Sequence, residues 1–376
     1  MFPLVASRFH ASIIPYHRIL YPDLHRIFAM GFSLQDEDPM RAFSFQTLLS
    51  DPKYAIFDFA PGETHTLSTE EDRLVAGHLT DTLMVAFLDK INFEYHQPSS
   101  NKQILADLKA WTDENMIPLC GGDARKIKAV TKAMHVSAIL PDYFFPHATH
   151  RARLLIAMAT TAGISLDDFV GDAEHSRFAS FASDLMMGKP ISDGWLGMYT
   201  KMMREYISYF SEEDPRPGAL GGESLVKFLS STALEDQFSR PDTLPPHLCP
   251  TTDPHGCCPE GFPYWHRYQS GASGAYVPPL FHSVPFDYWV TSVPHLVRYT
   301  NFSNDLLSFQ KEMLSGGELD MNYMSLQILA RRQARVPSRF GSPGSAWTYR
   351  DALCEVMDET YQTVYDLDRA FVEFPK

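Results

Sequence analysis

The sequence predicts an all-α protein, and three observations support this fold class. Apolar residues recur at helical spacing in a succession of segments from residue 68 to the end of the chain. Two of these segments open with a capping box, a pattern that marks helix starts. No convincing series of alternating strands separates them. We therefore predict a bundle of packed helices.

Length and composition describe a globular chain and exclude two classes of function. The 376 residues suffice for one large domain or two modest ones. Hydrophobic residues at 44% and charged residues at 21% argue against disorder. The net charge of −14 argues against a protein that binds nucleic acid non-specifically. The longest apolar stretch, residues 154–166, is interrupted by Thr160, Thr161 and Gly163 and is too short to span a membrane.

The first 67 residues are predicted to form an irregular N-terminal extension, and residues 68–376 the helical domain. Six prolines interrupt the short apolar pieces of residues 1–67, which is typical of a segment draped on a domain. Basic side chains break the apolar run of residues 1–20, and no small-residue cleavage site follows, so we predict no secretory signal. Asp23 is the first acidic residue, which leaves a transit-like leader as an alternative.

The helical domain opens with a start signal at Ser68. The pattern Ser68-x-x-Glu71 is a capping box, and its acidic first turn suits the helix dipole. Ser100-x-x-Gln103 is a second capping box, at the start of the next segment. After the helix that begins at Ser68, helices are predicted over residues 100–116, 123–139, 147–168, 176–187, 194–210, 223–238, 281–313, 322–334 and 348–373.

Two long loops interrupt these helices without dividing the domain. Residues 239–263 are dense in Pro, His and Cys, and residues 335–346 carry two prolines and two glycines. The helices on both sides of each loop would be needed to build one core, so neither loop is predicted to be a domain boundary. The sequence shows no internal repeat.

The cysteines favour a reducing, cytoplasmic location. They are five in number, an odd count in a long chain, which indicates free thiols. Their positions are Cys120, Cys249, Cys257, Cys258 and Cys354. A zinc site is an alternative for the last part of the first loop, where three of these cysteines lie near His247, His255 and His266. Their spacing fits no pattern with paired C-x₂-C ligands.

The polar face of one apolar helix offers ligands for a metal ion. In the segment NDLLSFQKE, residues 304–312, the side chains of Asn304, Ser308 and Glu312 are spaced four residues apart and line one helix face. An amide oxygen, a hydroxyl and a carboxylate are hard oxygen donors suited to Mg²⁺ or Mn²⁺. The alternative is a polar stripe on an ordinary surface helix, because all three residue types are common at surfaces.

An acidic cluster ends the predicted helix 147–168. Asp167 and Asp168 follow an apolar run, and Asp172 comes four residues after Asp168. Carboxylates packed this closely raise one another's pKa unless cations neutralise them, and acidic residues oppose the dipole at a helix C-terminus. A metal site would resolve this conflict. The alternative is a polar helix end that frays into a turn at Gly171.

The two motifs together predict more than either one. An aspartate-rich motif on one apolar helix and an Asn/Ser/Glu face on another could hold a cluster of Mg²⁺ ions across an all-α core. Such a cluster would bind a diphosphate through its oxygens.

At these motifs the sequence resembles the class I terpene cyclases, and within them the fungal sesquiterpene synthases of the trichodiene synthase and longiborneol synthase type. The segment NDLLSFQKE is similar to that group's second metal motif, and DDFVGD, residues 167–172, to its aspartate-rich motif with one extra residue before the last Asp. The resemblance implies that Asp167 is the principal metal bridge, helped by Asp168, and leaves the contribution of Asp172 in doubt.

The resemblance also implies two residues that contact the diphosphate. YWHRYQSG, residues 264–271, resembles the segment with the family's diphosphate-sensing arginine, a role that falls here to Arg267. Lys311, beside the last metal ligand, matches the family's diphosphate-contacting lysine. The alternatives are a loop arginine paired with a nearby carboxylate and a solvated lysine.

The resemblance covers residues 68–376 and departs from the family at the C-terminus. The family has an Arg-Tyr pair on a late helix that bonds the diphosphate when the site closes. Here residues 324–334 and 347–371 resemble the helices before that one, and neither Arg298-Tyr299 nor Arg369-Ala370 stands in its place. We therefore expect a terpenoid-synthase helical bundle around an apolar active-site cavity, and we expect this bundle to lack its last helix.

The implied activity is Mg²⁺-dependent ionisation and cyclisation of farnesyl diphosphate to a sesquiterpene. Three Mg²⁺ ions are expected, with Mn²⁺ as a substitute. The partner is then a prenyl diphosphate, with no nucleic acid and no membrane span, and a homodimer is left open. One rival is a chain-elongating prenyltransferase, although that family uses two aspartate-rich motifs. The other is a catalytically silent helical protein, because the expected last helix is missing.

Overall fold

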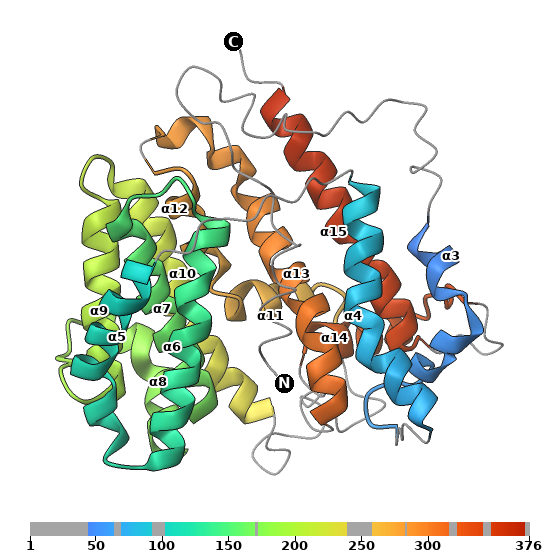
Figure 1. The fold of residues 1–376 in the computed structure, drawn as a ribbon, viewed down its shortest axis with the longest axis horizontal. Coiled ribbons are helices and arrows are strands. Elements are labelled where there is room, and N and C mark those ends of the chain that lie inside the picture. Colours follow the sequence, from blue (N-terminus) through green and yellow to red (C-terminus); the bar gives the residue numbers. More distant parts are fainter. Residues whose placement is uncertain are drawn as a thin grey trace. The chain divides into compact units, whose positions relative to one another are not determined.

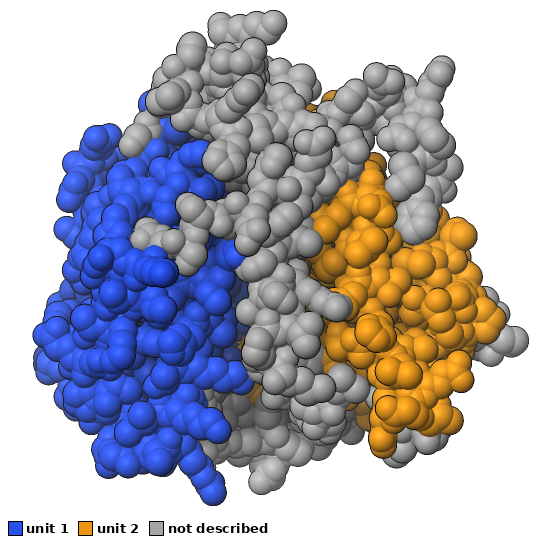
Figure 2. Space-filling model, viewed as in Figure 1, with its two compact units in different colours: residues 1–27, 95–233, 269–294 blue, residues 28–94, 234–268, 295–376 orange. Residues whose placement is uncertain are grey.

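The computed structural model divides the chain into two compact units. It describes residues 44–63, 69–91, 102–169, 172–238, 258–282, 284–315, 322–340 and 347–372. Unit 1 comprises Met1–Ile27, Tyr95–Ala233 and Gln269–Pro294, and unit 2 comprises Phe28–Glu94, Leu234–Tyr268 and His295–Lys376; Figure 2 colours them blue and orange. Within the described ranges every regular element is a helix and no strand occurs (Figure 1), which confirms the all-α class.

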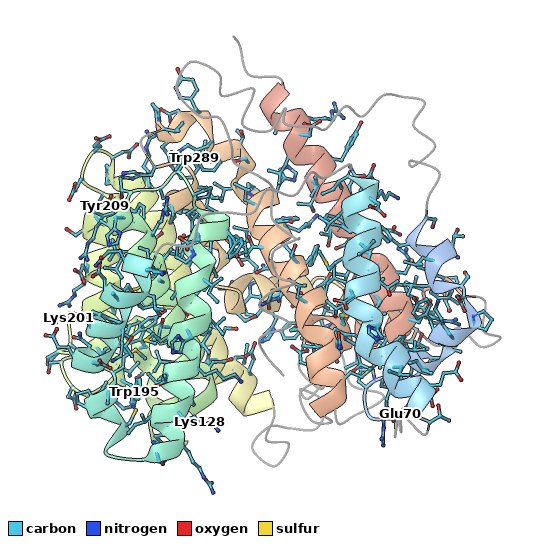
Figure 3. The ribbon with its side chains drawn as sticks, in the orientation of Figure 1. Glu70, Lys128, Trp195, Lys201, Tyr209 and Trp289 are labelled. Atoms are coloured by element: carbon cyan, nitrogen blue, oxygen red, sulfur yellow. The ribbon has the colours of Figure 1, made fainter. Side chains whose placement is uncertain are left out.

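The core of unit 1 surrounds helix α7 (His150–Phe169), which packs against α5, α6 and α9. The larger helices of this unit are α5 (Lys102–Asn115), α6 (Ala124–Phe144), α7, α8 (Asp172–Met186), α9 (Gly194–Phe210) and most of α10 (Pro215–Phe238). Its shorter elements are η4 (Ile117–Cys120), η6 (Ser273–Tyr276), α12 (Val277–Leu280), η7 (Phe286–Tyr288) and η8 (Val290–Ser292). Leu155 of α7 is fully buried, and the indole of Trp195 of α9 is almost so (Figure 3).

Glycines explain why α10 begins at Pro215, earlier than the predicted start at residue 223. Such residues disfavour a helix by propensity, but here they allow close packing on α9. A Cβ on Gly221 would lie 2.4 Å from Cε1 of the fully buried Tyr206, and one on Gly218 would lie 2.6 Å from the Ile207 carbonyl oxygen. Only a residue without a side chain fits these two places, so packing overrides propensity.

Unit 2 is built around α13 and α15. Its elements are α3 (Phe45–Leu49), η3 (Pro52–Phe57), α4 (Glu70–Lys90), most of α11 (Phe262–Ser270), α13 (Val293–Ser315), α14 (Tyr323–Gln333) and α15 (Tyr349–Val372). Helix α15 contacts α3, η3, α4 and α14. Its side chains from Ala352 to Cys354 are fully buried.

The described part of the N-terminal segment, residues 44–63, contributes to the core of unit 2. Phe45, Leu49 and Phe57 are fully buried, and α3 and η3 both contact α15. The main-chain N–H of Tyr349 donates to the Phe59 carbonyl at 2.9 Å. The division into an extension over residues 1–67 and a domain over 68–376 stays a prediction.

Side-chain caps mark the starts of α3, α4, α6 and α14, and α4 shows how a start can shift by one residue. Thr69, not Ser68, caps this helix: its hydroxyl accepts the Asp72 N–H at 3.0 Å, and the Asp72 carboxylate accepts the Thr69 N–H at 3.0 Å. The capping box is therefore Thr69-x-x-Asp72, with Glu70 (labelled in Figure 3) as the first helical residue. Two overlapping boxes differ by one position, and the sequence does not choose between them.

Two helical regions differ from the prediction. The single helix expected over residues 281–313 is a run of short elements followed by α13, which begins only at Val293. Pro285 is one reason, because proline lacks the N–H that a continuous helix requires. Helix α11 was not predicted, since its sequence follows a proline-rich loop.

Three cysteines lie in the described ranges, and all three are buried free thiols: Cys120, Cys258 and Cys354. Burial raises the pKa of the Cys354 thiol to about 11, which makes the reactive thiolate rare near neutral pH. Cys249 and Cys257 lie outside the described residues. Among the described helices, none is long and apolar enough to cross a membrane.

Candidate functional site

Helix α13 presents the predicted metal-binding face of Asn304, Ser308 and Glu312. Asn304 is exposed, and Ser308 and Glu312 are half-buried. The remaining sides of the helix are packed, with Leu306 and Phe309 buried as predicted and Leu307 half-buried. One stripe of the helix is therefore polar, and the stripes beside it are packed into the core.

The buried side of α13 is anchored by three other elements. The ring of Phe309 lies 6.0 Å from that of Phe57 in η3 and 5.6 Å from that of Tyr349 in α15, measured between centroids. The Gln310 amide donates to the Gly77 carbonyl of α4 at 2.6 Å. These contacts fix the rotation of the helix, and with it the direction of the polar face.

Arg267, the residue expected to sense a diphosphate, lies against the N-terminal end of this face. Its side chain extends from α11 to α13. There its Nη2 donates to Asn304 Oδ1 at 2.9 Å and to the Asn301 carbonyl at 3.2 Å. Its Nε lies 2.8 Å from Asp305 Oδ1 and 3.1 Å from Oδ2. The structure thus brings together two predicted site residues, Arg267 and Asn304, that are far apart in sequence.

Asp305 is a residue of this site that the sequence reading missed. Its carboxylate is 9% exposed, and burial raises its pKa to about 6, although the Arg267 guanidinium opposes that rise. The signal in the sequence was an acidic residue beside Asn304, off the polar stripe and thus on a packed side. A buried carboxylate there requires a cation, and Arg267 supplies it.

The other end of the face is held by Asn322, which the sequence reading also missed as a site residue. Asn322 is the N-cap of α14, and its Nδ2 donates to Glu312 Oε2 at 2.8 Å. Between the two ends, the Ser308 hydroxyl donates to the Asp305 carbonyl at 3.4 Å. The predicted helix over residues 322–334 begins at Asn322, but neither the capping role of Asn322 nor its contact with Glu312 was predicted.

The donor set on α13 fits a hard divalent cation by chemistry. An amide oxygen, a hydroxyl and a carboxylate on successive turns offer the oxygen ligands that Mg²⁺ takes, usually beside water and substrate oxygens. Among the described residues, no three His, Cys, Asp or Glu side chains form a group that could hold a metal ion. The α13 set contains a single carboxylate and two neutral donors, so it is a site that would need further ligands.

The aspartate-rich motif lies in unit 1, at the C-terminal end of α7. Asp167 is exposed in the last turn of this helix, and Asp168 follows it. Asp172 is the first residue of α8, so the motif joins two helices instead of continuing one. The side chains of Asp168 and Asp172 lie outside the described residues. Joint action of this motif with the α13 face therefore stays a prediction.

Two further predictions lie partly outside the description. The backbone of Lys311 belongs to α13, but its side chain is not among those described. In the zinc alternative, Cys258 and His266 are described. The Cys258 thiol donates to the Leu326 carbonyl at 3.4 Å, and burial lowers the pKa of the His266 imidazole to about 4. The other members of that alternative lie outside the described residues.

Comparison with known proteins gives one partial similarity to report. No family model matches the chain. The chain is 24% identical over 204 residues to the (E)-beta farnesene synthase of Metarhizium brunneum (strain ARSEF 3297). The aligned region covers 53% of this chain and 57% of that protein. The chain thus spans about half the length of the curated relative it matches. This similarity supports a terpene synthase relationship and does not distinguish a type within that family.

Proposed function

We propose that this protein is a sesquiterpene synthase, which ionises farnesyl diphosphate with Mg²⁺ and releases diphosphate. The single observation that carries the proposal is the contact of Arg267 with Asn304 at 2.9 Å. It joins a cation suited to phosphate with an oxygen donor suited to Mg²⁺, two groups that a metal–diphosphate site requires side by side. The partial similarity to a farnesene synthase supports the same class of substrate.

Each residue of the face has a distinct role in this proposal. Asn304, Ser308 and Glu312 would hold one metal ion, and Asp167 with Asp168 would hold others. Bound Mg²⁺ would neutralise the negative charge that develops on the diphosphate as the carbon–oxygen bond breaks. Arg267 would donate to the diphosphate oxygens, and Lys311 would add a second cation. An apolar surrounding would then exclude water from the allylic cation.

The contact between Arg267 and Asn304 also predicts an order of events. While Asn304 Oδ1 accepts from the guanidinium, that oxygen faces a positive charge, which disfavours a metal ion at the same atom. Arrival of the diphosphate would offer Arg267 a stronger, bidentate acceptor and release the amide oxygen to the metal. Substrate and metal are therefore expected to bind cooperatively.

The test is incubation of the full chain with geranyl, farnesyl or geranylgeranyl diphosphate and Mg²⁺, with volatile products read by gas chromatography–mass spectrometry. We expect hydrocarbon or alcohol products from farnesyl diphosphate, including farnesene alongside cyclic products. Ser308→Ala should reduce turnover by about 100-fold or more, as loss of a group that stabilises transition-state charge does. Full turnover by Asn304→Ala or Glu312→Ala would overturn the assignment.

Ser303→Ala is the matched control for Ser308→Ala. Both serines are half-buried residues of α13, and the chemical change is the same. Ser303 lies off the row of proposed ligands, so its replacement should leave turnover within a few-fold. Equal losses in both variants would indicate damage to the helix and not removal of a ligand.

Two further measurements separate the rival functions. Isopentenyl diphosphate added with farnesyl diphosphate would be consumed by a chain-elongating enzyme, which would yield a longer diphosphate. A silent protein would give no product, and a melting temperature unaffected by Mg²⁺ with pyrophosphate would show that its binding site is also lost.

A further inference from the structure

A chain of hydrogen bonds links the end of the metal-binding face to the core of unit 2. Glu312 Oε2 accepts from Asn322 Nδ2 at 2.8 Å. Asn322 Oδ1 accepts from the Ser325 N–H at 2.8 Å and from the Ser325 hydroxyl at 2.9 Å. The Ser325 hydroxyl lies 2.7 Å from that of Tyr349. The chain therefore runs from α13 through the start of α14 to α15.

The direction of each bond in this chain follows from the chemistry of its members. A serine hydroxyl has one hydrogen, and Ser325 uses it on Asn322, so Tyr349 must be the donor to Ser325. The Asn322 carbonyl oxygen is then the acceptor for both Ser325 groups, which places its NH₂ group on the other side. That side faces Glu312, which must accept. The opposite orientation of the amide would lose its bonds to both Ser325 and Glu312.

Burial makes this orientation rigid. Ser325 is 0% exposed and Tyr349 1% exposed, so water does not compete for their hydroxyls. The backbone of Tyr349 is held in turn by the Phe59 carbonyl at 2.9 Å. Reversing the Asn322 amide would set its NH₂ group against the Ser325 N–H and its oxygen against a carboxylate oxygen. Both contacts would be repulsive, and the hydrogen bonds on both sides of the amide would be lost.

We propose that Asn322 is a positioning residue of the metal-binding face, which orients the carboxylate of Glu312 toward the metal while it caps α14. The proposal rests on the proposed role of Glu312 as a metal ligand. Outer partners of this kind fix the plane of a ligating carboxylate, and their loss typically weakens metal binding by about 10–100-fold. A cap alone would support the helix and leave the metal affinity unchanged.

The decisive variant is Asn322→Ser. Serine caps a helix about as well as asparagine, but its shorter side chain does not extend to Glu312. We expect a metal-free melting temperature close to that of the unchanged protein. We also expect Mn²⁺ binding in the presence of pyrophosphate, followed by electron paramagnetic resonance, to weaken by about 10–100-fold. A variant that binds Mn²⁺ as tightly as the unchanged protein would overturn the proposal.

Glu312→Gln separates failure of this proposal from failure of the proposed function. If Glu312→Gln loses Mn²⁺ binding while Asn322→Ser keeps it, the metal site stands and the positioning role of Asn322 is refuted. If the unchanged protein binds no Mn²⁺ with pyrophosphate, or Glu312→Gln binds it equally well, the proposed metal site itself fails. Loss in both variants supports both proposals.

A control for lost stability uses a second cap in the same unit. Thr69 caps α4 through its hydroxyl, and Thr69→Ala should lower the melting temperature, as Asn322→Ala should through its lost cap. If Asn322→Ser has a melting temperature as low as that of Asn322→Ala, serine has failed to replace the cap. The Mn²⁺ affinities of Asn322→Ala and Thr69→Ala, which each lose one helix cap, are then compared instead. A weaker Mn²⁺ affinity only in Asn322→Ala supports the proposal, and equal affinities overturn it.

Discussion

The two units bury different kinds of polar group, and the contrast follows their proposed roles. Of the charged residues described in unit 1, only Asp142 is buried, beside Arg153 at 3.6 Å. Unit 2 buries three carboxylates and one guanidinium among its described residues. They are Asp305, Asp351, Glu355 and Arg350.

Buried serine and threonine hydroxyls form different kinds of hydrogen bond in α7 of unit 1 and at the start of α14 in unit 2. In α7 of unit 1, Thr160, Thr161 and Ser165 each donate to the carbonyl four residues earlier, at 2.8 Å. These three bonds stay within one helix, although the Thr160 hydroxyl also lies 2.9 Å from the hydroxyl of Tyr276. In unit 2 the hydroxyl of Ser325 joins α14 to α15. Tyrosine hydroxyls also join elements of unit 1: Tyr199 donates to the Leu225 carbonyl at 2.9 Å, and Tyr206 to the Ala275 carbonyl at 2.7 Å. The contrast between the units therefore lies in their buried charges and, among serines and threonines, in the difference between α7 and Ser325.

The largest expected effect comes from breaking a buried ion pair in unit 2. Arg331 Nη2 lies 2.7 Å from Glu355 Oε1, with the side chains 19% and 10% exposed. Arg331→Met should lower the free energy of unfolding by up to about 3–5 kcal/mol, because it leaves the buried carboxylate with only the more distant Arg339, at 4.0 Å, as a cation. Denaturant unfolding followed by circular dichroism measures this change.

The double variant Arg331→Met with Glu355→Gln tests whether the uncompensated charge is the cause. It removes both charges and leaves an amide that can still accept from Gln327, which now donates to Glu355 Oε2 at 2.9 Å. Most of the lost stability should return, because the penalty belongs to the lone charge and not to the missing pair. A double variant as unstable as Arg331→Met would show that packing of the Arg331 side chain matters more than its charge.

The sequence predicted the parts of this structure that depend on local pattern. Helix type followed from apolar spacing, and the α9 range of 194–210 was correct to the residue. The α13 face was also predictable, because three polar side chains four residues apart on an apolar helix need no tertiary information. The roles of the site residues stay predictions.

Tertiary contacts explain what the sequence could not predict. The early start of α10 depends on the fit of Gly221 against Tyr206. The roles of Asp305 and Asn322 depend on which residue of another segment lies opposite, Arg267 for the first and Glu312 for the second. Neither pairing leaves a periodic signal in a single sequence, since the partners are brought together by packing.

A second prediction concerns Glu359 of α15, whose burial beside the negative Glu355 raises its pKa from the ordinary 4.5 to about 7. A raised folded-state pKa means that the protonated form is the stabilising one. That contribution is fully present below about pH 4.5 and is lost as pH rises through 7. The positive groups that oppose the rise are Arg298, Arg331 and Arg339.

Glu359→Gln removes this pH dependence, because the amide is neutral throughout. We expect the variant to be more stable than the unchanged protein at pH 8, by about 1–2 kcal/mol. The difference should shrink toward zero near pH 4.5. Urea unfolding at both pH values measures it. A variant less stable than the unchanged protein at pH 8 would mean that the ionised carboxylate stabilises the fold through its three arginines.

The smallest expected effect is in unit 1, where Thr161→Val should change the free energy of unfolding by no more than about 1 kcal/mol. The Thr161 hydroxyl is fully buried but bonds only the Ala157 carbonyl of its own helix. Valine nearly keeps the shape and leaves no donor unmade. Ser325→Ala in unit 2 is the matched contrast, since it removes the hydroxyl that joins Asn322 to Tyr349 and keeps only the main-chain N–H on Asn322 Oδ1, and it should cost about 1–3 kcal/mol. Equal losses in the two variants would mean that buried hydroxyls serve both units alike, and the contrast would then rest on the charges alone.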